Sequence, residues 1–297
     1  MTLSQAIDDF IIDRELKMFT VKTVQNYRDV LGAYLRFVGN VDLTEFSYNK
    51  HIQPYIKHLI SKGLSRASVG SYLRHLRAFV NYLEEQSIIE QNSVARLIKP
   101  PKTEKKNINL LSPNDIHLLF ESITGESEWI IVRNRLFVAL MYDSGLRQEE
   151  LTKIQKSDFD FDRNVLSVHG KGNKDRYVPF GKFTLDLINK YLVLCPFVTD
   201  YFFCERYGKS ITCNLIKKFM FKLQRLTGIA DLSCHKLRHN FATNFCIDGY
   251  QRDGFVDNIK LKTLMGHESL QTTEVYMHEA YEIVSTSHFR SHLDSIF

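Results

Sequence analysis

Six residues of types that act on phosphate esters are spread over the second half of the chain. In chain order they are Arg147, Lys171, His235, Arg238, His267 and Tyr276. An arginine guanidinium is always charged and can donate two parallel hydrogen bonds to phosphate oxygens. A tyrosine hydroxyl can attack a phosphate and keep it as an ester, but its ordinary pKa near ~10 requires neighbours that stabilise the developing charge. Each residue alone would be an ordinary surface or core residue, so the combination has to carry the interpretation.

These residues lie in four short motifs. Ser144 to Leu151 is SGLRQEEL, Gly170 to Lys174 is GKGNK, His235 to Thr243 is HKLRHNFAT, and Leu264 to His267 is LMGH, with Tyr276 nine residues later. Their order and spacing resemble the signature of the tyrosine recombinases, the phage-integrase-like site-specific recombinases. The resemblance covers most of the chain, and the combination is far more specific than any single motif.

The resemblance implies an enzyme that exchanges DNA strands. Tyr276 would be the nucleophile that forms a 3′-phosphotyrosyl intermediate, which retains the bond energy for rejoining. Arg147 and Arg238 would bind the scissile phosphate, where loss of one preorganised donor typically costs on the order of 100–1000-fold in rate. Lys171, in a turn, would protonate the departing 5′ oxygen, with Lys174 as the competing candidate.

The other site residues are also implied by the resemblance. His235 and His267 correspond to the family's acid–base and phosphate-binding histidines, and Glu150 to an acidic residue that orients a basic neighbour. The family further implies no cofactor and a homotetramer or heterotetramer that exchanges strand pairs in sequence between two double-stranded DNA sites. The compact chain favours a Xer-like or small mobile-element recombinase.

The same stretches argue against three other chemistries. His235 and His239 are four residues apart, but Lys236 stands where a zinc-protease helix needs a glutamate, so no metal site is expected. His239 is instead predicted to be a packed, hydrogen-bonded helix residue. The glycines at 170 and 172 lack the third glycine of a dinucleotide-binding loop. No acidic cluster resembles a two-metal nuclease site.

Composition indicates a globular protein, with 44% hydrophobic and 25% charged residues among 297. No apolar run approaches the roughly 20 residues that span a bilayer, and aspartates in the first 14 residues argue against a secretory signal. Five cysteines without a C-x-x-C pair predict reduced thiols in a cytoplasmic protein. The net charge of +5 is modest, so any DNA footprint must come from local clusters.

Residues 1–98 are predicted to form a bundle of four amphipathic helices. The first covers 4–17, the second follows Thr20, the third has Pro54 in its first turn, and the fourth follows Ser65. The resemblance identifies this bundle as a SAM-like core-binding domain. Candidate DNA contacts off the apolar stripe of the fourth helix are Arg66, Arg74 and Arg77.

Residues 99–107 form a proline- and lysine-rich linker at the domain boundary. Its lysines could follow the phosphate backbone, and the arm after the lysine turn adds further candidates. These predicted DNA contacts are Lys102, Lys105, Lys106, Lys174 and Arg176.

Residues 108–297 are predicted to form the catalytic domain, mainly α with a small β-hairpin. Ser112 and Pro113 begin a helix, 129–143 forms another, and strands at 165–169 and 176–179 flank the lysine turn. From about 182 onward the pattern is helical, with a short strand expected at 201–203.

Two segments of the catalytic domain need separate predictions. Residues 246–258 are longer and more polar than the tight turn that the family pattern leads us to expect, which predicts a lengthened loop near the site. Residues 277–297 form a tail, for which we predict docking on a neighbouring subunit through Phe289 and Leu293, with a hinge at Ser285 to Ser287.

Two alternative functions remain open from the sequence. A type IB topoisomerase would use the same chemistry to relax supercoils without joining two partners. A catalytically silent DNA-binding regulator on the same scaffold would lack active residues, whereas all six are present here.

Overall fold

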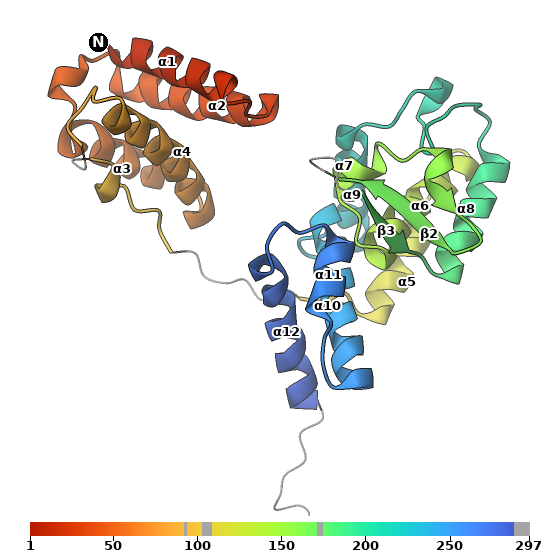
Figure 1. Cartoon of the computed structure of the whole chain (residues 1–297). Helices are drawn as coiled ribbons and strands as arrows, with labels where there is room; N and C mark the ends of the chain where they lie inside the picture. The colour runs from red at the N-terminus through yellow and green to blue at the C-terminus, as the bar shows by residue number, and fades with distance from the viewer. Residues whose placement is uncertain (92–93, 103–108, 171–174, 288–297) are drawn as a thin grey trace, which may run out of the picture. The chain divides into compact units, whose positions relative to one another are not determined.

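The computed structural model describes residues 1–91, 94–102, 109–170 and 175–287. The chain divides into two compact units, Met1–Lys106 and Asn107–Phe297, which Figure 1 shows as a helical bundle and a larger mixed unit. Each unit has a hydrophobic core of its own. The fold is therefore mainly helical, as the sequence predicts. No helix in the described ranges has the length and apolar character needed to cross a membrane.

Within its described residues, the first unit is built from four α-helices, and side-chain caps set the starts of α1, α2 and α4. Thr20 and Ser65 accept hydrogen bonds from backbone N–H groups of the first turn, as expected for N-cap residues. Three short 3-10 or π turns, η1 to η3, fill the connections. The elements are α1 (Leu3–Leu16), α2 (Val21–Val38), η1 (Leu43–Glu45), η2 (Tyr48–Ile52), α3 (Gln53–Ser61), α4 (Arg66–Glu85) and η3 (Ala95–Leu97).

Aromatic side chains join the helices of this bundle. Phe10 of α1 packs edge-on against Phe79 and Tyr82 of α4, and Tyr34 of α2 packs against Tyr55 of α3. All are buried, and burial of one large apolar side chain contributes roughly 1.5–3 kcal/mol. The opposite face of α4 is left to polar residues.

The second unit contains eight α-helices, two 3-10 turns and three strands within its described residues. They are α5 (Pro113–Ser122), α6 (Glu128–Asp143), α7 (Gln148–Leu151), η4 (Lys156–Asp158), β1 (Phe159–Asp160), β2 (Val165–His169), β3 (Asp175–Pro179), α8 (Lys182–Leu194), η5 (Arg206–Gly208), α9 (Cys213–Thr227), α10 (Cys234–Asp253), α11 (Asn258–Met265) and α12 (Gln271–Ser287). Ser112 and Asp115 form a capping box with Pro113 in the first turn of α5, as predicted.

The three strands form one antiparallel sheet in the order β1-β2-β3. β2 and β3 are the two strands of the predicted hairpin, with Val168 paired to Arg176 and His169 to Asp175. Because side chains alternate along a strand, β3 buries Arg176 and Val178 and exposes the residues between them. The sheet therefore directs an arginine inward.

The second unit has two hydrophobic clusters of very different size. The main core extends from α5 through α9 and includes the first turns of α10. A separate cluster joins α10, α11 and α12 and consists of Ala242, Cys246, Val256, Leu261, Met265, Tyr276 and Ala280. Tyr276 thus belongs to the smaller cluster.

Two sequence predictions for this unit are wrong. The predicted loop at 246–258 is mostly helix, because α10 continues to Asp253 and ends at Gly254 in the left-handed conformation. Val256 then packs inward and Asp257 caps α11. The strand expected at 201–203 is reduced to an isolated bridge between Gln155 and Tyr201.

The C-terminal tail begins inside a continuous helix. α12 carries Tyr276 and runs through Ser285 to Ser287, so the chain here does not bend at the residues predicted as a hinge. The predicted tail anchors, Phe289 and Leu293, lie outside the described residues.

Candidate active site

Arg147 is presented by a sharp turn between α6 and α7. Gly145 has φ +62°, and a Cβ there would lie 2.4 Å from the ring of Phe241, so only glycine fits. Arg147 follows as the N-cap of α7, and its backbone N–H donates to Glu150 Oε2 at 2.7 Å. Its side chain remains 41% exposed, which leaves room for a ligand beside it.

Glu150 is the buried carboxylate at the centre of the site. Arg147 Nη1 donates to Glu150 Oε1 at 3.0 Å, while Arg176 Nη1 and Nη2 donate to the two carboxylate oxygens at 2.8 Å each. Burial alone would raise the pKa of Glu150, but the hydrogen bonds and charge of Arg176, followed by those of Arg147, lower it overall. The carboxylate therefore stays ionised between two cations.

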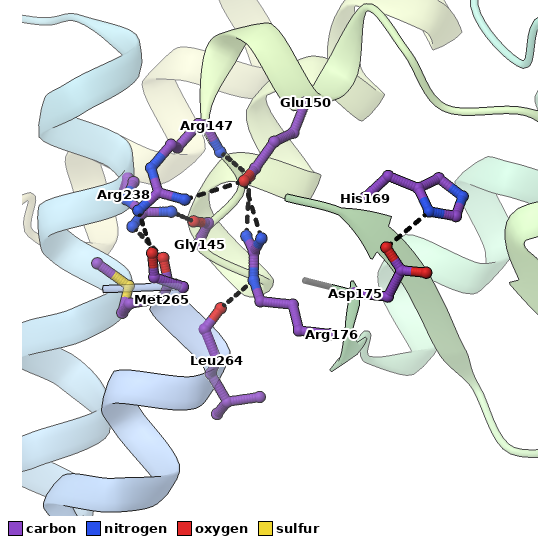
Figure 2. A network of polar contacts seen from close by, with 10 residues as sticks. Gly145, Arg147, Glu150, His169, Asp175, Arg176, Arg238, Leu264 and Met265 are labelled. Carbon is purple, nitrogen blue, oxygen red and sulfur yellow. Dashed lines mark hydrogen bonds and ion pairs between the residues drawn. The ribbon is translucent and has the colours of Figure 1, made fainter. Parts of the chain in front are cut away.

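Three guanidinium groups converge on the C-terminal end of α11. Arg176 Nε donates to the Leu264 carbonyl at 2.7 Å, Arg238 Nη2 to that of Met265, and Arg147 Nη2 to that of Gly266 at 2.6 Å. Figure 2 shows the first two of these contacts around Glu150. The last carbonyls of a helix lack partners within it and carry partial negative charge, so cations stabilise this end.

Arg238 is deeply buried in α10. It is 4% exposed, and its Nη1 also donates to the Gly145 carbonyl, which joins the turn before α7 to the end of α11. Burial, and then the charge of Arg147, lower the pKa of Arg238 to about 10, so it remains charged near neutral pH. Three arginines around one glutamate leave a net positive charge that suits a phosphate.

Gly266 permits this convergence. It ends α11 with φ +59°, and a Cβ there would lie 3.1 Å from Nη1 of both Arg147 and Arg176. A side chain would therefore be strained by the backbone and would push on two guanidinium groups. The residue links helix termination directly to the arginine cluster.

His267 and Tyr276 follow the arginine cluster along the chain. His267 Nδ1 lies 3.0 Å from Thr273 Oγ1, and its ring stacks on Tyr276 with centroids 6.2 Å apart. Burial and the three arginines lower the pKa of His267 to about 4, so it is neutral at pH 7. Burial raises the pKa of Tyr276 to about 12, against the opposing effect of Arg238. Tyr276 is only 3% exposed.

His239 lies against the tyrosine rather than in the hydrogen-bonded position we predicted. Its ring is 5.2 Å from Tyr276 and 3.9 Å from His235, centroid to centroid. Within the described residues its Nδ1 is buried with no hydrogen-bond partner, and the same holds for Thr243 Oγ1 one turn later. Partial burial, and then His235, lower the pKa of His239 to about 4. His235 itself is exposed.

Five of the six predicted catalytic residues therefore meet around the end of α11. They are Arg147, His235, Arg238, His267 and Tyr276. The sixth, Lys171, lies outside the described residues, as do the predicted DNA contacts Lys105, Lys106 and Lys174.

Arg176, which we predicted to contact DNA, is buried in the structure. It is 6% exposed, and its guanidinium binds Glu150 and the Leu264 carbonyl. The alternation of Asp175 to Pro179 already contained the signal, since Arg176 shares a strand face with Val178. Thr273 and Gly266 were also missed, because their contacts with His267 and the arginines are tertiary.

The other predicted DNA contacts with described positions are exposed in the first unit. Arg66, Arg74 and Arg77 line α4, where turns of about 100° per residue bring positions 66, 74 and 77 to one side. Pro100 and Pro101 return to this side, because a Cβ on Gly70 would lie within 4 Å of both. Lys102 follows directly and is exposed.

No metal centre is found in the described ranges, where no three His, Cys, Asp or Glu side chains gather suitably. The chemistry that the described residues offer is that of phosphate binding by arginines beside a buried tyrosine. Such an arrangement can transfer a phosphoryl group to the tyrosine once the ring reaches it.

Comparison with known proteins agrees with this chemistry. Residues 109–282 match the model of the phage integrase family, which is more than half of the chain. The chain is 29% identical to tyrosine recombinase XerC of Staphylococcus carnosus (strain TM300), covering 93% of each protein. It is 30% identical to XerC of Staphylococcus aureus (strain bovine RF122 / ET3-1), covering 92% of this chain and 91% of that protein.

Solved structures share the fold. XerH bound to palindromic difH in a post-cleavage complex aligns with a TM-score of 0.73 at 22% identity, over 90% of this chain and 79% of that one. The Tn1549 transposon integrase in complex with circular intermediate DNA aligns with a TM-score of 0.76 at 17% identity, over 98% and 100%.

Proposed function

This chain belongs to the phage integrase family and is a tyrosine-type site-specific DNA recombinase, and we propose that Tyr276 is its nucleophile. The proposal rests on one observation: Arg147, Arg238 and His267 gather at one end of α11, and Tyr276 packs against His267. The topoisomerase and silent-regulator alternatives are not favoured, since the relatives described above are named recombinases.

In the proposed reaction, Tyr276 Oη attacks the phosphorus of the scissile phosphodiester. The Oη–P bond forms, the bond from phosphorus to the 5′ oxygen breaks, and the 3′ end stays attached to the protein. The tyrosine proton passes to a neutral histidine, for which His235 is the candidate, and Lys171 protonates the 5′ oxygen. A 5′ hydroxyl from the partner duplex then attacks the phosphotyrosine and joins the exchanged strands.

Arg147 and Arg238 bind the two non-bridging oxygens, whose charge grows as phosphorus becomes pentacoordinate. Their guanidinium groups are preorganised by Glu150, Gly145 and the end of α11, so little reorganisation is needed when charge develops. His267, neutral and oriented by Thr273, can add a hydrogen bond to the phosphate from its second ring nitrogen.

Recognition of double-stranded DNA is assigned to the basic side of α4 and the linker. The exposed residues there are Arg66, Arg74, Arg77 and Lys102. Their side chains can bind phosphates of the DNA backbone, and such contacts do not depend on the base sequence. Binding should weaken steeply with salt, because such contacts release condensed counterions. Arg74→Ala should lower the slope of log affinity against log salt by about 1, and an unchanged slope would remove Arg74 from the interface.

The working assembly is proposed to be a tetramer in the cytoplasm, with residues after α12 exchanged between subunits. Since α12 continues to Ser287 and buries Ala280, the exchanged segment should begin after Ser287. Truncation after Ser287 should preserve binding to a single site and abolish the multi-subunit complex. A truncated protein that recombines two sites at the parental rate would remove trans exchange from the mechanism.

The nucleophile is tested by covalent trapping on DNA. Nicked substrates lose the short 5′-hydroxyl fragment after cleavage, so the adduct accumulates and its DNA can be sequenced. Mass spectrometry of the adduct should find the nucleotide on the peptide that contains Tyr276. Attachment to any other residue, such as Tyr281 on the same helix, would refute the assignment.

A further inference from the structure

We propose that Arg176 is a positioning residue of the active site, which neutralises and orients Glu150 so that the positive charge of Arg147 remains available to the scissile phosphate. The inference rests on the proposed role of Arg147 in phosphate binding. It gives a function to a buried cation that the reaction steps above do not use.

The first support is where β3 directs the side chain. Arg176 lies on the inner face of the strand with Val178, and its side chain is only 5% exposed. A buried arginine is rare unless it is paired, because moving the charge out of water is costly. Direct contact with DNA is therefore an unsuitable role, whereas contact with the site interior is unavoidable.

The second support is how the guanidinium is used. Its three nitrogens each engage a group of the site: two donate to the two oxygens of Glu150 and the third donates to the Leu264 carbonyl. Figure 2 shows this fork between the carboxylate and the end of α11. A lysine ammonium cannot reproduce the planar, two-pronged contact and the third bond together.

The third support is that Glu150 is shared between two arginines. It also accepts from the backbone N–H of Arg147 at 2.7 Å and from Arg147 Nη1 at 3.0 Å. With Arg176 present, one carboxylate is divided between two cations, and Arg147 retains positive charge toward the open side of the site. Without Arg176, Glu150 would pair with Arg147 alone and would set its negative charge against an anionic phosphate.

The fourth support is the place of Arg176 in the chain. It lies five residues after Lys171 in the chain and contacts the residue two positions before Gly266, whose carbonyl binds Arg147. A single side chain therefore connects strand β3, the carboxylate, and the segment leading to His267. Its removal should misplace several groups by small amounts rather than remove any one of them.

The charge argument predicts a result that a purely stabilising residue would not produce. A methylphosphonate at the scissile position lacks the negative charge of the phosphodiester, so it is not repelled by an uncompensated Glu150. Neutral Arg176→Gln should therefore be defective on the phosphodiester and less defective on the methylphosphonate. A variant that only loosens the fold would be slowed equally on both.

The test uses the full-length protein and the DNA sequence recovered from wild-type covalent adducts. Single-turnover cleavage is measured at saturating DNA for wild type, Arg176→Gln, Arg176→Lys and the control Arg163→Met, an exposed arginine near β2. Burst amplitude reports the competent fraction and the rate constant reports positioning. On the phosphodiester, both Arg176 variants should cleave about 10–100-fold more slowly with unchanged affinity, as for other supporting partners of reactive groups. Arg163→Met should match wild type.

The methylphosphonate substrate distinguishes a positioning role of Arg176 from a purely stabilising role. The proposal expects the Arg176→Gln defect to shrink at least severalfold, while Arg176→Lys, which keeps its charge, should show a similar defect on both substrates. Equal defects of Arg176→Gln on both substrates, or rates equal to that of Arg163→Met, would overturn it. If Arg176→Gln does not fold, Arg176→Lys decides alone: a wild-type rate constant on the phosphodiester refutes the need for the fork. Failure of wild type to form an adduct would instead refute the proposed nucleophilic chemistry.

Discussion

The arginine cluster and the tyrosine-bearing helix meet at the same turn after α11, yet they are held in different ways. Arg147, Arg176 and Arg238 are fixed by hydrogen bonds to Glu150 and to three successive carbonyls. Arg147 and Arg176 come from elements between α6 and β3 that rest on the main core of the unit, and Arg238 comes from the first turns of α10, which join that core through Leu237. The phosphate-binding half is therefore assembled in the free protein.

Tyr276, by contrast, packs in a small cluster with six other buried residues, as far as the structure is described, from α10, the α10–α11 connection, α11 and α12. Beside this cluster, two buried polar atoms of α10 have no partner within the described residues: His239 Nδ1, whose ring lies against Tyr276, and Thr243 Oγ1 one turn later. We call this part of α10 the seam. Each unpaired buried group costs about 1–3 kcal/mol. The tyrosine itself is buried, with its pKa raised by that burial to about 12.

This difference in packing and hydrogen bonding indicates that the phosphate-binding site is rigid, whereas the nucleophile must be repositioned. Burial keeps Tyr276 protonated and away from water, while the weakly satisfied seam lowers the cost of moving α12. Catalytic elements that move are commonly drawn from the less stable parts of a fold. We infer that DNA binding and assembly reposition α12 and bring Tyr276 to the phosphate.

Tyr276→Phe should give the largest effect, because it removes the nucleophilic oxygen and leaves the ring in its cluster. No covalent adduct should form on a nicked substrate, and DNA affinity in a gel-shift assay should equal that of wild type. Recovery of adduct from the phenylalanine protein would mean that another residue attacks the phosphate.

Glu150→Gln tests the arginine half by leaving Arg176 buried without its charge partner. Removing one member of a buried ion pair typically costs about 3–5 kcal/mol of unfolding free energy. Denaturant unfolding should show this loss, while the exposed control Glu121→Gln should lie within about 0.5 kcal/mol of wild type. Equal stability of the two variants would contradict a tightly constructed arginine cluster.

Thr243→Val tests the tyrosine half in the opposite direction. It replaces a buried hydroxyl, unpaired as far as the structure is described, with a methyl group of similar size. Stability should rise by about 1 kcal/mol, or roughly 2–4 °C in melting temperature. The matched control is Thr273→Val, whose hydroxyl binds His267 and whose loss should destabilise. If both variants destabilise equally, the seam is not poorly satisfied.

His169, at the end of β2, offers the smallest effect. Its hydrogen bond to Asp175, and next to Asp158, raise its pKa above the ordinary value near ~6.5, against partial desolvation. A raised folded pKa adds stability that is complete below about pH 6.5 and is lost as pH rises through the folded pKa. The melting-temperature advantage of wild type over His169→Asn should therefore shrink with increasing pH. A melting-temperature advantage that grows with pH would mean that folding lowers the pKa of His169 and would contradict this prediction.

Local sequence signals predicted much of the fold. N-caps such as Thr20 and Ser65 and the pairing of strands β2 and β3 depend on residues close together in the sequence, so their predicted boundaries agree closely with the structure. The polar stretch after Phe245 did not, because its composition concealed two further helical turns that end only at Gly254. Phe202 and Phe203 suggested a strand, but they fill the core from an irregular segment.

Site residues whose role follows from their amino-acid type and motif were predicted, whereas those whose role depends on tertiary neighbours were not. Arg147, Arg238 and His267 were identified from motif spacing, and they converge in space. The inward position of Arg176 and the unpartnered His239 within the described seam depend on which tertiary neighbours arrive. An arginine near a lysine turn suggested DNA contact, although strand alternation indicated burial.

Native-state amide hydrogen exchange tests most directly whether the arginine cluster is held more firmly than the helix that carries Tyr276. In the free protein, amides of α12 around Tyr276 should exchange through openings of lower free energy than amides of α6 around Phe137, which lies in the main core. Binding to the cognate site should change protection in α12 and leave that of α6 and α7 unaltered. If α12 is as protected as α6 in the free protein, the nucleophile is fixed as firmly as the arginines and the contrast between the two halves is wrong.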